Sequence, residues 1–271
     1  MSTYFQEKVV IITGSSMGIG KSLALLLGKQ HAKVVLNGRN QQKLLETETE
    51  LKNLGYEIFS IAGDVTLEED CKRLIQTTLN RFGRIDILVN NAGAGMRGKI
   101  ADLSPETIST IYKVNAIAPI VLSQMALPHI IETKGSIVFT SSLAGLRGLP
   151  LLSVYSAAKM SLTAFAQALR AEQAISKIHV GLVYVGITQL EIGKTAIGPD
   201  GKPVPLAARK GLLVKTIDEV ASKIARNISS RKKQTVIGLP GKIFFLLVRY
   251  LPRLFEFVLL RSQKKINKLY K

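Results

Sequence analysis

Short apolar runs and longer amphipathic segments alternate along most of the chain. The β-branched runs at 8–12 and 33–36 predict strands that are buried on both faces, because apolar residues follow one another without polar alternation. The segments 41–54 and 153–173 carry apolar residues at helical spacing and predict amphipathic helices. We expect further strands at 57–62, 86–90, 178–184 and 234–237, and further helices at 67–82, from Ser104 onward and at 217–228. Strands that alternate with helices indicate an α/β fold with a parallel sheet.

The chain shows no internal division until its last part. No linker rich in Pro, Ser and Gly interrupts the 271 residues, and 46% hydrophobic residues suffice for a large core. We therefore expect one domain over residues 1–240. Residues 241–271 are predicted to form a basic amphipathic tail that is not an independent domain.

Cysteine content and the N-terminal sequence bear on the compartment. Cys71 is the single cysteine, so no internal disulfide can form and a reducing compartment is expected. The first residues lack a charged segment followed by an apolar stretch and a small-residue cleavage site, so no signal peptide is expected. These features predict a cytoplasmic protein.

Positive charge is concentrated near the C-terminus. The net charge is +18, and residues 202–271 hold 17 Lys and Arg against 3 Asp and Glu, or +14. The first 201 residues hold 20 basic and 16 acidic residues, or +4. This asymmetry indicates an anionic partner such as a lipid surface or nucleic acid. The chain has no helix-turn-helix, zinc-ligand or aromatic ribonucleoprotein motif, so we expect neither nucleic-acid binding nor a metal site.

A glycine-rich turn follows the first predicted strand. The sequence Thr13-Gly-Ser-Ser-Met-Gly-Ile-Gly20 leads into a helical pattern, which is the arrangement that cradles phosphates. Gly14 permits the tight turn, Gly18 lets a pyrophosphate approach the backbone, and Gly20 lets helix and strand pack closely. A purely structural turn is the alternative, and the strand and helix on either side favour nucleotide binding.

The second and third strands end in charged residues. Arg39 follows the second strand where a carboxylate would bind a ribose 2′-hydroxyl, so the interpretation is NADP rather than NAD, with a solvated turn residue as the alternative. Asp64 follows the third strand and either touches the adenine edge or caps the next helix.

Three residues suggest acid–base chemistry. Tyr155 and Lys159 are four apart in a predicted helix and therefore share one face. A neighbouring cation favours the phenolate, so such a tyrosine can exchange a proton near neutral pH. Ser142, presented by the preceding strand, can hold a substrate carbonyl against that phenol. A Tyr–Lys pair at this spacing also occurs by chance.

Amide side chains occupy two further positions. Asn91 lies in Asn90-Asn-Ala-Gly93 after the fourth strand and either bonds the neighbouring backbone or approaches an adenosine ribose. Asn115 lies within an apolar helical pattern, where a buried amide needs hydrogen-bond partners.

Taken together, these motifs resemble the short-chain dehydrogenase/reductase family over roughly residues 6–240. The match rests on the Gly14-x-x-x-Gly18-x-Gly20 turn, the Asn90-Asn-Ala-Gly93 segment, Asn115, Ser142 and Tyr155-x-x-x-Lys159, in the family's order. The resemblance implies a Rossmann-type, doubly wound seven-stranded sheet of order 3-2-1-4-5-6-7 with helices on both faces. It also implies a homodimer or homotetramer.

The resemblance assigns roles to these residues. Tyr155 is the implied general acid/base, Ser142 orients the substrate oxygen, Lys159 favours the tyrosine phenolate and binds the nicotinamide ribose, and Asn115 holds a water of the proton relay. NADP(H) is the expected cofactor, with NAD(H) as the alternative. The implied cofactor contacts are Gly14, Ser15, Ser16, Gly18, Ile19, Gly20, Arg39, Asp64, Val65, Asn91, Ala92, Gly93, Tyr155, Lys159, Gly186 and Thr188.

The sequence departs from the family pattern in three places. Met17 stands where many NADP-preferring members have arginine, which leaves the NADP prediction on Arg39. Val185-Gly-Ile-Thr188 replaces the usual Pro-Gly segment beside the carboxamide. The family's Asp-Gly-Gly ending is missing. Separately, residues 191–213 are the expected substrate loop.

The tail is apolar and basic. Arg249, Pro252, Arg253 and Glu256 interrupt its apolar run, so it does not match a membrane span. A helix lying on an anionic membrane surface fits better, and packing on another subunit or over the substrate cleft is the alternative. Such tails occur in family members that act on lipid-like carbonyl compounds.

We therefore expect an NADPH-dependent reductase, or alcohol dehydrogenase in reverse, for a small hydrophobic carbonyl or alcohol substrate at a membrane periphery. A 3-oxoacyl-thioester reductase that docks an acidic carrier protein is the alternative. A non-catalytic nucleotide-sensing protein is a more distant alternative.

Overall fold

The computed structural model describes residues 3–190, 194–206 and 214–262. Its central sheet has seven parallel strands in the order β3-β2-β1-β4-β5-β6-β9. The strands are β1 Val9–Thr13, β2 Lys33–Gly38, β3 Ile58–Ala62, β4 Ile87–Asn90, β5 Ser136–Ser142, β6 His179–Val185 and β9 Gln234–Val236. β9 occupies the place of the predicted seventh strand, so the predicted fold and strand order are confirmed.

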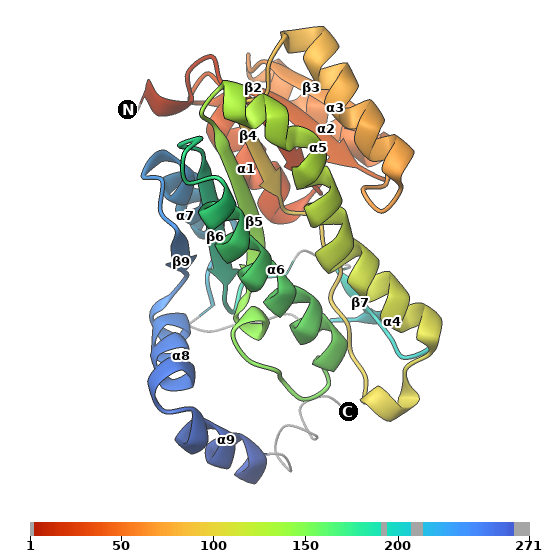
Figure 1. Cartoon of the computed structure of the whole chain (residues 1–271). Helices are drawn as coiled ribbons and strands as arrows, with labels where there is room; N and C mark the ends of the chain where they lie inside the picture. The colour runs from red at the N-terminus through yellow and green to blue at the C-terminus, as the bar shows by residue number, and fades with distance from the viewer. Residues whose placement is uncertain (1–2, 191–193, 207–213, 263–271) are drawn as a thin grey trace.

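Helices cover both faces of the sheet (Figure 1). They are α1 Gly18–Gly28, α2 Gln41–Asn53, α3 Glu68–Phe82, α4 Pro105–Tyr112, α5 Ala118–Glu132, α6 Ser153–Glu172, α7 Ile217–Ser229, α8 Leu239–Tyr250 and α9 Pro252–Arg261. Residues of α1, α2 and α7 share one buried cluster with β1 residues such as Val10, and those of α3, α5 and α6 share another with residues such as Val9. Successive β1 side chains thus point to opposite faces, as strand geometry requires.

Two local features were not predicted. A short antiparallel hairpin, β7 Thr195–Ile197 with β8 Pro203–Pro205, lies within the expected substrate loop. Positions 191–193 and 207–213 of the expected loop lie outside the described residues. In addition, a π-helical turn at Lys113–Ile117 separates α4 from α5. One helical stretch within the described residues, Pro105–Glu132, is long and apolar enough to cross a membrane. Nearly half of its most apolar 18-residue segment is buried inside the protein.

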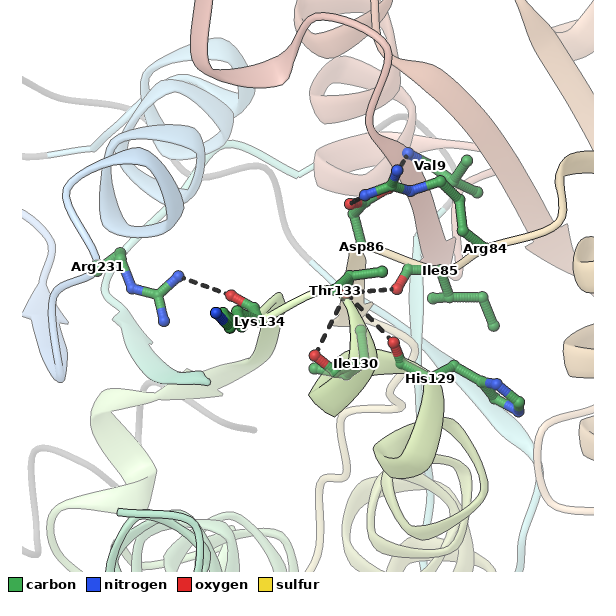
Figure 2. A network of polar contacts seen from close by, with 9 residues as sticks. All are labelled: Val9, Arg84, Ile85, Asp86, His129, Ile130, Thr133, Lys134 and Arg231. Carbon is green, nitrogen blue, oxygen red and sulfur yellow. Dashed lines mark hydrogen bonds and ion pairs between the residues drawn. The ribbon is translucent and has the colours of Figure 1, made fainter. Parts of the chain in front are cut away.

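The amino ends of the strands carry a connected polar network (Figure 2). The buried Asp86 carboxylate accepts hydrogen bonds from the Val9 N–H at 2.9 Å and from the Arg84 guanidinium at 2.6 and 2.9 Å. Nearby, the Thr133 hydroxyl lies 3.0 Å from the Ile85 carbonyl oxygen, and Arg231 donates to the Lys134 carbonyl at 3.1 Å. The network joins β1, β4 and the loops before β5 and β9.

Candidate active site

A cleft of roughly 2030 Å³ opens at the carboxyl ends of the strands. Parallel strands bring their carboxyl ends to one edge, so residues that follow β1, β2, β3, β4, β5 and β6 meet there. The predicted site residues that line this cleft are Gly14, Ser16, Gly18, Ile19, Arg39, Asp64, Val65, Asn91, Ala92, Gly93, Asn115, Ser142, Tyr155, Lys159, Gly186 and Thr188.

The glycine turn lies between β1 and the start of α1. Gly14 has φ 63° and Gly18 has φ 60°, conformations that favour glycine. A Cβ on Gly14 would also lie 2.9 Å from the Ala92 Cα, so the turn must pass β4 closely. Gly18 begins α1, and its position in the cleft directs the helix N-terminus at the space where an anion would lie.

Two predicted cofactor residues stay outside the cleft. Ser15 is fully buried, and its hydroxyl donates to the Ile12 carbonyl at 2.8 Å while its N–H donates to the Asn37 carbonyl at 3.0 Å. Gly20 packs against the turn, where a Cβ would lie 2.3 Å from the Gly14 carbonyl oxygen. Ser15 therefore joins β1 to β2, and Gly20 permits close packing, as its spacing predicts.

The end of the cleft beside β2 and β3 carries positively charged side chains and a carboxylate. Arg39 is largely exposed and lies 3.7 Å from an oxygen of Asp64. Asp64 also accepts hydrogen bonds from the Thr66 N–H and hydroxyl at 2.9 and 2.8 Å. Because α3 begins at Glu68 with Leu67 as its N-cap, the alternative that Asp64 caps this helix is wrong.

Sequence reasoning missed a second cation at this end. Lys43 lines the cleft with Arg39 and lies in the first turn of α2, whose N-cap is Asn40. A lysine four residues after Arg39 at a helix start was the available signal.

Asn91 fixes the turn between β1 and β4. Its side-chain amide donates to the carbonyls of Thr13 and Gly14 at 3.0 and 3.1 Å. The Thr13 hydroxyl in turn accepts from the N–H groups of Asn91 and Ala92, both at 3.0 Å. The backbone-bonding alternative for Asn91 is thus observed. Thr13 is a structural partner that the sequence analysis did not name as a site residue.

Ser142, Tyr155 and Lys159 lie on adjacent elements. Ser142 ends β5, and its hydroxyl accepts from the Ala144 N–H at 3.2 Å. Tyr155 lies in the first turn of α6, with Lys159 one turn further on. The Lys159 Nζ is 6.0 Å from the centroid of the Tyr155 ring, so the phenol and the ammonium share one side of the helix as predicted.

Lys159 is a buried cation with a defined contact. Its Nζ donates to the Thr140 carbonyl at 3.1 Å, and only 5% of the residue is exposed. Burial lowers the pKa of Lys159 from 10.5 to about 8, because the interior disfavours the charged form. The side chain therefore remains mainly protonated at neutral pH.

Asn115 lies in the π-helical turn and is fully buried. Its amide donates to the carbonyls of Ala94 and Ile111 at 2.9 and 3.0 Å. Its Oδ1 has no hydrogen-bond partner within the described part of the chain. A Cβ on Gly93 would lie 2.8 Å from this oxygen and 3.4 Å from the Lys159 Nζ, so both atoms face the same place beside the cleft. Wide turns of this kind often mark functional sites.

The chain after β6 forms another wall of the cleft. Thr188 is buried, and its hydroxyl donates to the Gly186 carbonyl at 3.3 Å. Thr188 also pairs with Lys215 as an isolated parallel bridge, which holds this segment against the start of α7. Phe244 of α8 also lines the cleft, and the sequence analysis did not assign it to the site.

Comparisons with known proteins agree with this geometry. A family model described as short chain dehydrogenase matches residues 8–197. The Arabidopsis thaliana protein 11-beta-hydroxysteroid dehydrogenase-like 4A is 37% identical over 190 residues, which cover 69% of this chain and 62% of that protein. The Xenopus laevis protein dehydrogenase/reductase SDR family member 7B is 30% identical over 273 residues, which cover 98% of this chain and 84% of that protein.

Solved structures give the same fold. A metagenomic short-chain oxidoreductase in complex with NADP is 26% identical with a TM-score of 0.71, covering 86% of this chain and 98% of its own. A Burkholderia phymatum short chain dehydrogenase/reductase in complex with NAD is 21% identical with a TM-score of 0.78, covering 95% and 96%. These structural neighbours bind nicotinamide cofactors of both kinds. By sequence, site and fold, the chain belongs to the short-chain dehydrogenase/reductase family of oxidoreductases.

Proposed function

We propose that the protein reduces a ketone or aldehyde on a hydrophobic, lipid- or steroid-like substrate with NADPH, or oxidises the corresponding alcohol in reverse. The observation that carries this proposal is the meeting of Ser142, Tyr155, Lys159 and Asn115 in one cleft beside a glycine-rich helix start. The hydroxysteroid dehydrogenase-like name of a plant relative supports the substrate class.

The residues present fit a nicotinamide dinucleotide. The N–H groups at the start of α1 suit the pyrophosphate, and the small residues Ala92 and Gly93 leave room for a ribose at the end of β4. Gly186 and Thr188 border the place proposed for the carboxamide. Arg39 and Lys43 supply two positive charges for a 2′-phosphate, which supports NADP(H), with NAD(H) as the weaker alternative.

The chain's own residues would manage the proton. When bound, NADPH supplies the hydride that reduces the carbonyl carbon. The Ser142 hydroxyl holds the carbonyl oxygen, and the Tyr155 phenol donates its proton to that oxygen. The Lys159 ammonium favours the resulting phenolate and binds the nicotinamide ribose. The unpartnered Oδ1 of Asn115 faces the same place as the Lys159 Nζ, so it suits a water through which the proton is replaced.

The lining of the cleft supports an apolar substrate. Apolar side chains from the loop before α6 and from the β7–β8 hairpin border it, namely Leu149, Leu151, Leu152, Ile197, Pro199 and Val204. We also propose that the protein is a cytoplasmic homodimer or homotetramer at a membrane periphery.

A 3-oxoacyl-thioester reductase remains the second candidate function, because Lys99, Lys113 and Lys194 also line the cleft and suit an acidic carrier protein.

The proposal is tested by substituting Tyr155 with phenylalanine. Tyr155→Phe should reduce NADPH-dependent turnover of hydrophobic ketones by about 1000-fold, because the proton donor is lost, while NADPH affinity stays within about twofold. Tyr112→Phe is the matched control, since Tyr112 is a half-buried tyrosine outside the cleft. Full turnover by Tyr155→Phe would refute the acid/base assignment.

A further inference from the structure

The last two described helices expose apolar stripes. In α8, Leu239, Ile243, Leu246 and Tyr250 recur at helical spacing and are each about half exposed or more. In α9, Leu254, Phe257, Val258 and Leu260 are each about half exposed. Gly241 is the one buried residue among those described in these two helices. The stripes therefore contribute little to the core and form an apolar surface of their own.

The opposite sides of these helices attach to the protein beside the active site. The Phe244 and Phe255 rings meet edge to face with centroids 5.1 Å apart, which joins α8 to α9. Phe244 also lines the cleft. Glu256 of α9 lies 3.2 Å from Arg147, five residues after Ser142. Figure 1 shows α8 and α9 extending away from the sheet below β9. The helix pair thus has an inner side at the cleft and an outer apolar side.

Cations border the outer side. Lys242 and Arg249 are seven residues apart in α8 and lie next to the apolar stripe. Arg253 and Arg261 belong to α9, and the Arg261 guanidinium lies 4.2 Å from the centroid of the Phe257 ring. Glu256, the single acidic residue of the two helices, already pairs with Arg147. Among the described residues no carboxylate forms an ion pair with these four cations, so this side combines apolar residues with net positive charge.

We infer that α8 and α9 dock on an anionic lipid bilayer and deliver a lipid-borne substrate from it, past Phe244, to Ser142 and Tyr155. Interfacial helices bury their apolar side chains at the acyl boundary while Lys and Arg reach the anionic headgroups. A second copy of the chain suits this surface less well, because a two-fold contact places the same patch, and hence the same cations, against itself. The delivery step rests on the proposed function, whereas the docking step does not.

Docking is tested by sedimentation of the full chain with vesicles. The wild-type protein should pellet with phosphatidylglycerol-containing vesicles and at least about tenfold less with pure phosphatidylcholine vesicles. Leu246→Asp should lose pelleting at least about tenfold. Leu45→Asp is the matched control, because Leu45 of α2 is 48% exposed and Leu246 is 52% exposed. A wild-type protein that stays in the supernatant with both vesicle types refutes docking. A solution dimer that Leu246→Asp dissociates, without pelleting, assigns the surface to a second copy and also refutes it.

Delivery is tested by comparing two forms of substrate. With a ketone embedded in anionic vesicles, Leu246→Asp should raise KM at least about tenfold, whereas kcat/KM for a short water-soluble ketone should stay within about twofold of wild type. An equal loss with both ketones, or no loss with either, refutes delivery through this surface. If the wild-type protein pellets with vesicles but oxidises NADPH with neither ketone, the proposed function fails and docking stands.

Discussion

The two ends of the sheet use buried polar groups in different ways. At the amino ends, the Asp86 carboxylate accepts three hydrogen bonds, and Thr133 and Arg231 bond to backbone carbonyls (Figure 2). At the carboxyl ends, the buried Lys159 has one protein acceptor, and the Oδ1 of Asn115 has no partner within the described residues. The Thr140 hydroxyl, which also lines the cleft, is likewise without a partner among the described residues, whereas at the amino ends the Asn227 Oδ1 is the one such atom. Because unmet buried polar groups cost stability, the carboxyl end leaves more of them for a ligand, and the amino end favours stability.

The difference between the amino and carboxyl ends of the sheet is tested most strongly by the Lys159→Met variant. Methionine keeps an unbranched apolar stem but removes a buried, desolvated charge. We expect turnover with NADPH to fall about 1000-fold, while the free energy of unfolding rises by about 1 kcal/mol. Ketone assays and urea denaturation of the same preparation measure the two quantities. A loss of stability in this variant would contradict the proposed difference between the two ends.

Asp86→Ala is the converse test at the amino end. Removing the carboxylate leaves the Val9 N–H and the Arg84 guanidinium without their acceptor, so we expect the free energy of unfolding to fall by about 3 kcal/mol. Turnover per folded molecule should stay within about twofold of wild type. Asp64→Ala at the cleft is the control, since Asp64 is more exposed, and its loss should alter cofactor affinity more than stability.

His179, at the amino end of β6, should make stability depend on pH. Its ring nitrogens lie 3.2 Å from the Ser136 hydroxyl and 2.9 Å from the Lys232 carbonyl oxygen. Burial, with nearby Arg231 and Arg170, lowers the pKa of His179 from 6.5 to about 4, so the folded protein holds the neutral ring. The unfolded chain binds the proton first, and stability should therefore fall by roughly 2 kcal/mol as pH drops from about 6.5 to about 4.

Denaturation curves across this pH range measure the effect. His179→Gln should flatten the dependence in that window, even where the variant is less stable at every pH. An unchanged pH slope in His179→Gln would assign the dependence to other groups.

The smallest expected effect concerns Arg39. Because this guanidinium is largely exposed, Arg39→Ala should weaken NADPH binding by only about tenfold and leave NADH binding within about twofold. Fluorescence titration with both cofactors measures the difference, and Arg226→Ala on the exposed side of α7 is the control. Equal losses for both cofactors would show that Arg39 does not read the 2′-phosphate.

Periodicity and motif spacing predicted the sheet, and most of the predicted site residues line the cleft. The β-branched runs lie in strands because both faces of a parallel sheet are buried, as at β1. The i,i+4 spacing placed Tyr155 and Lys159 on one side of α6, since helix geometry fixes which residues are neighbours. Both results depend on local rules that a sequence carries directly.

What the sequence did not reveal depends on long-range contacts. The π-helical turn at Asn115 was not predicted, because Ile111, Val114 and Ile117 fit the spacing of an ordinary α-helix. The Ser15 side chain points into the protein, where its hydroxyl donates to the Ile12 carbonyl and accepts from the Asn37 N–H on β2. The predicted tail helix is two helices, α8 and α9, with the break at Leu251 where Pro252 follows.

The π-helical turn also determines how the chain tolerates changes in length. Each residue of an α-helix advances the direction of its side chains by about 100°, so a deletion within α5 would turn Leu122 and Ala126 away from the sheet. A deletion inside Lys113–Ile117 would instead narrow the wide turn and leave both flanking helices in register. A deletion in this turn can therefore spare the fold while it moves the amide of Asn115 away from the cleft.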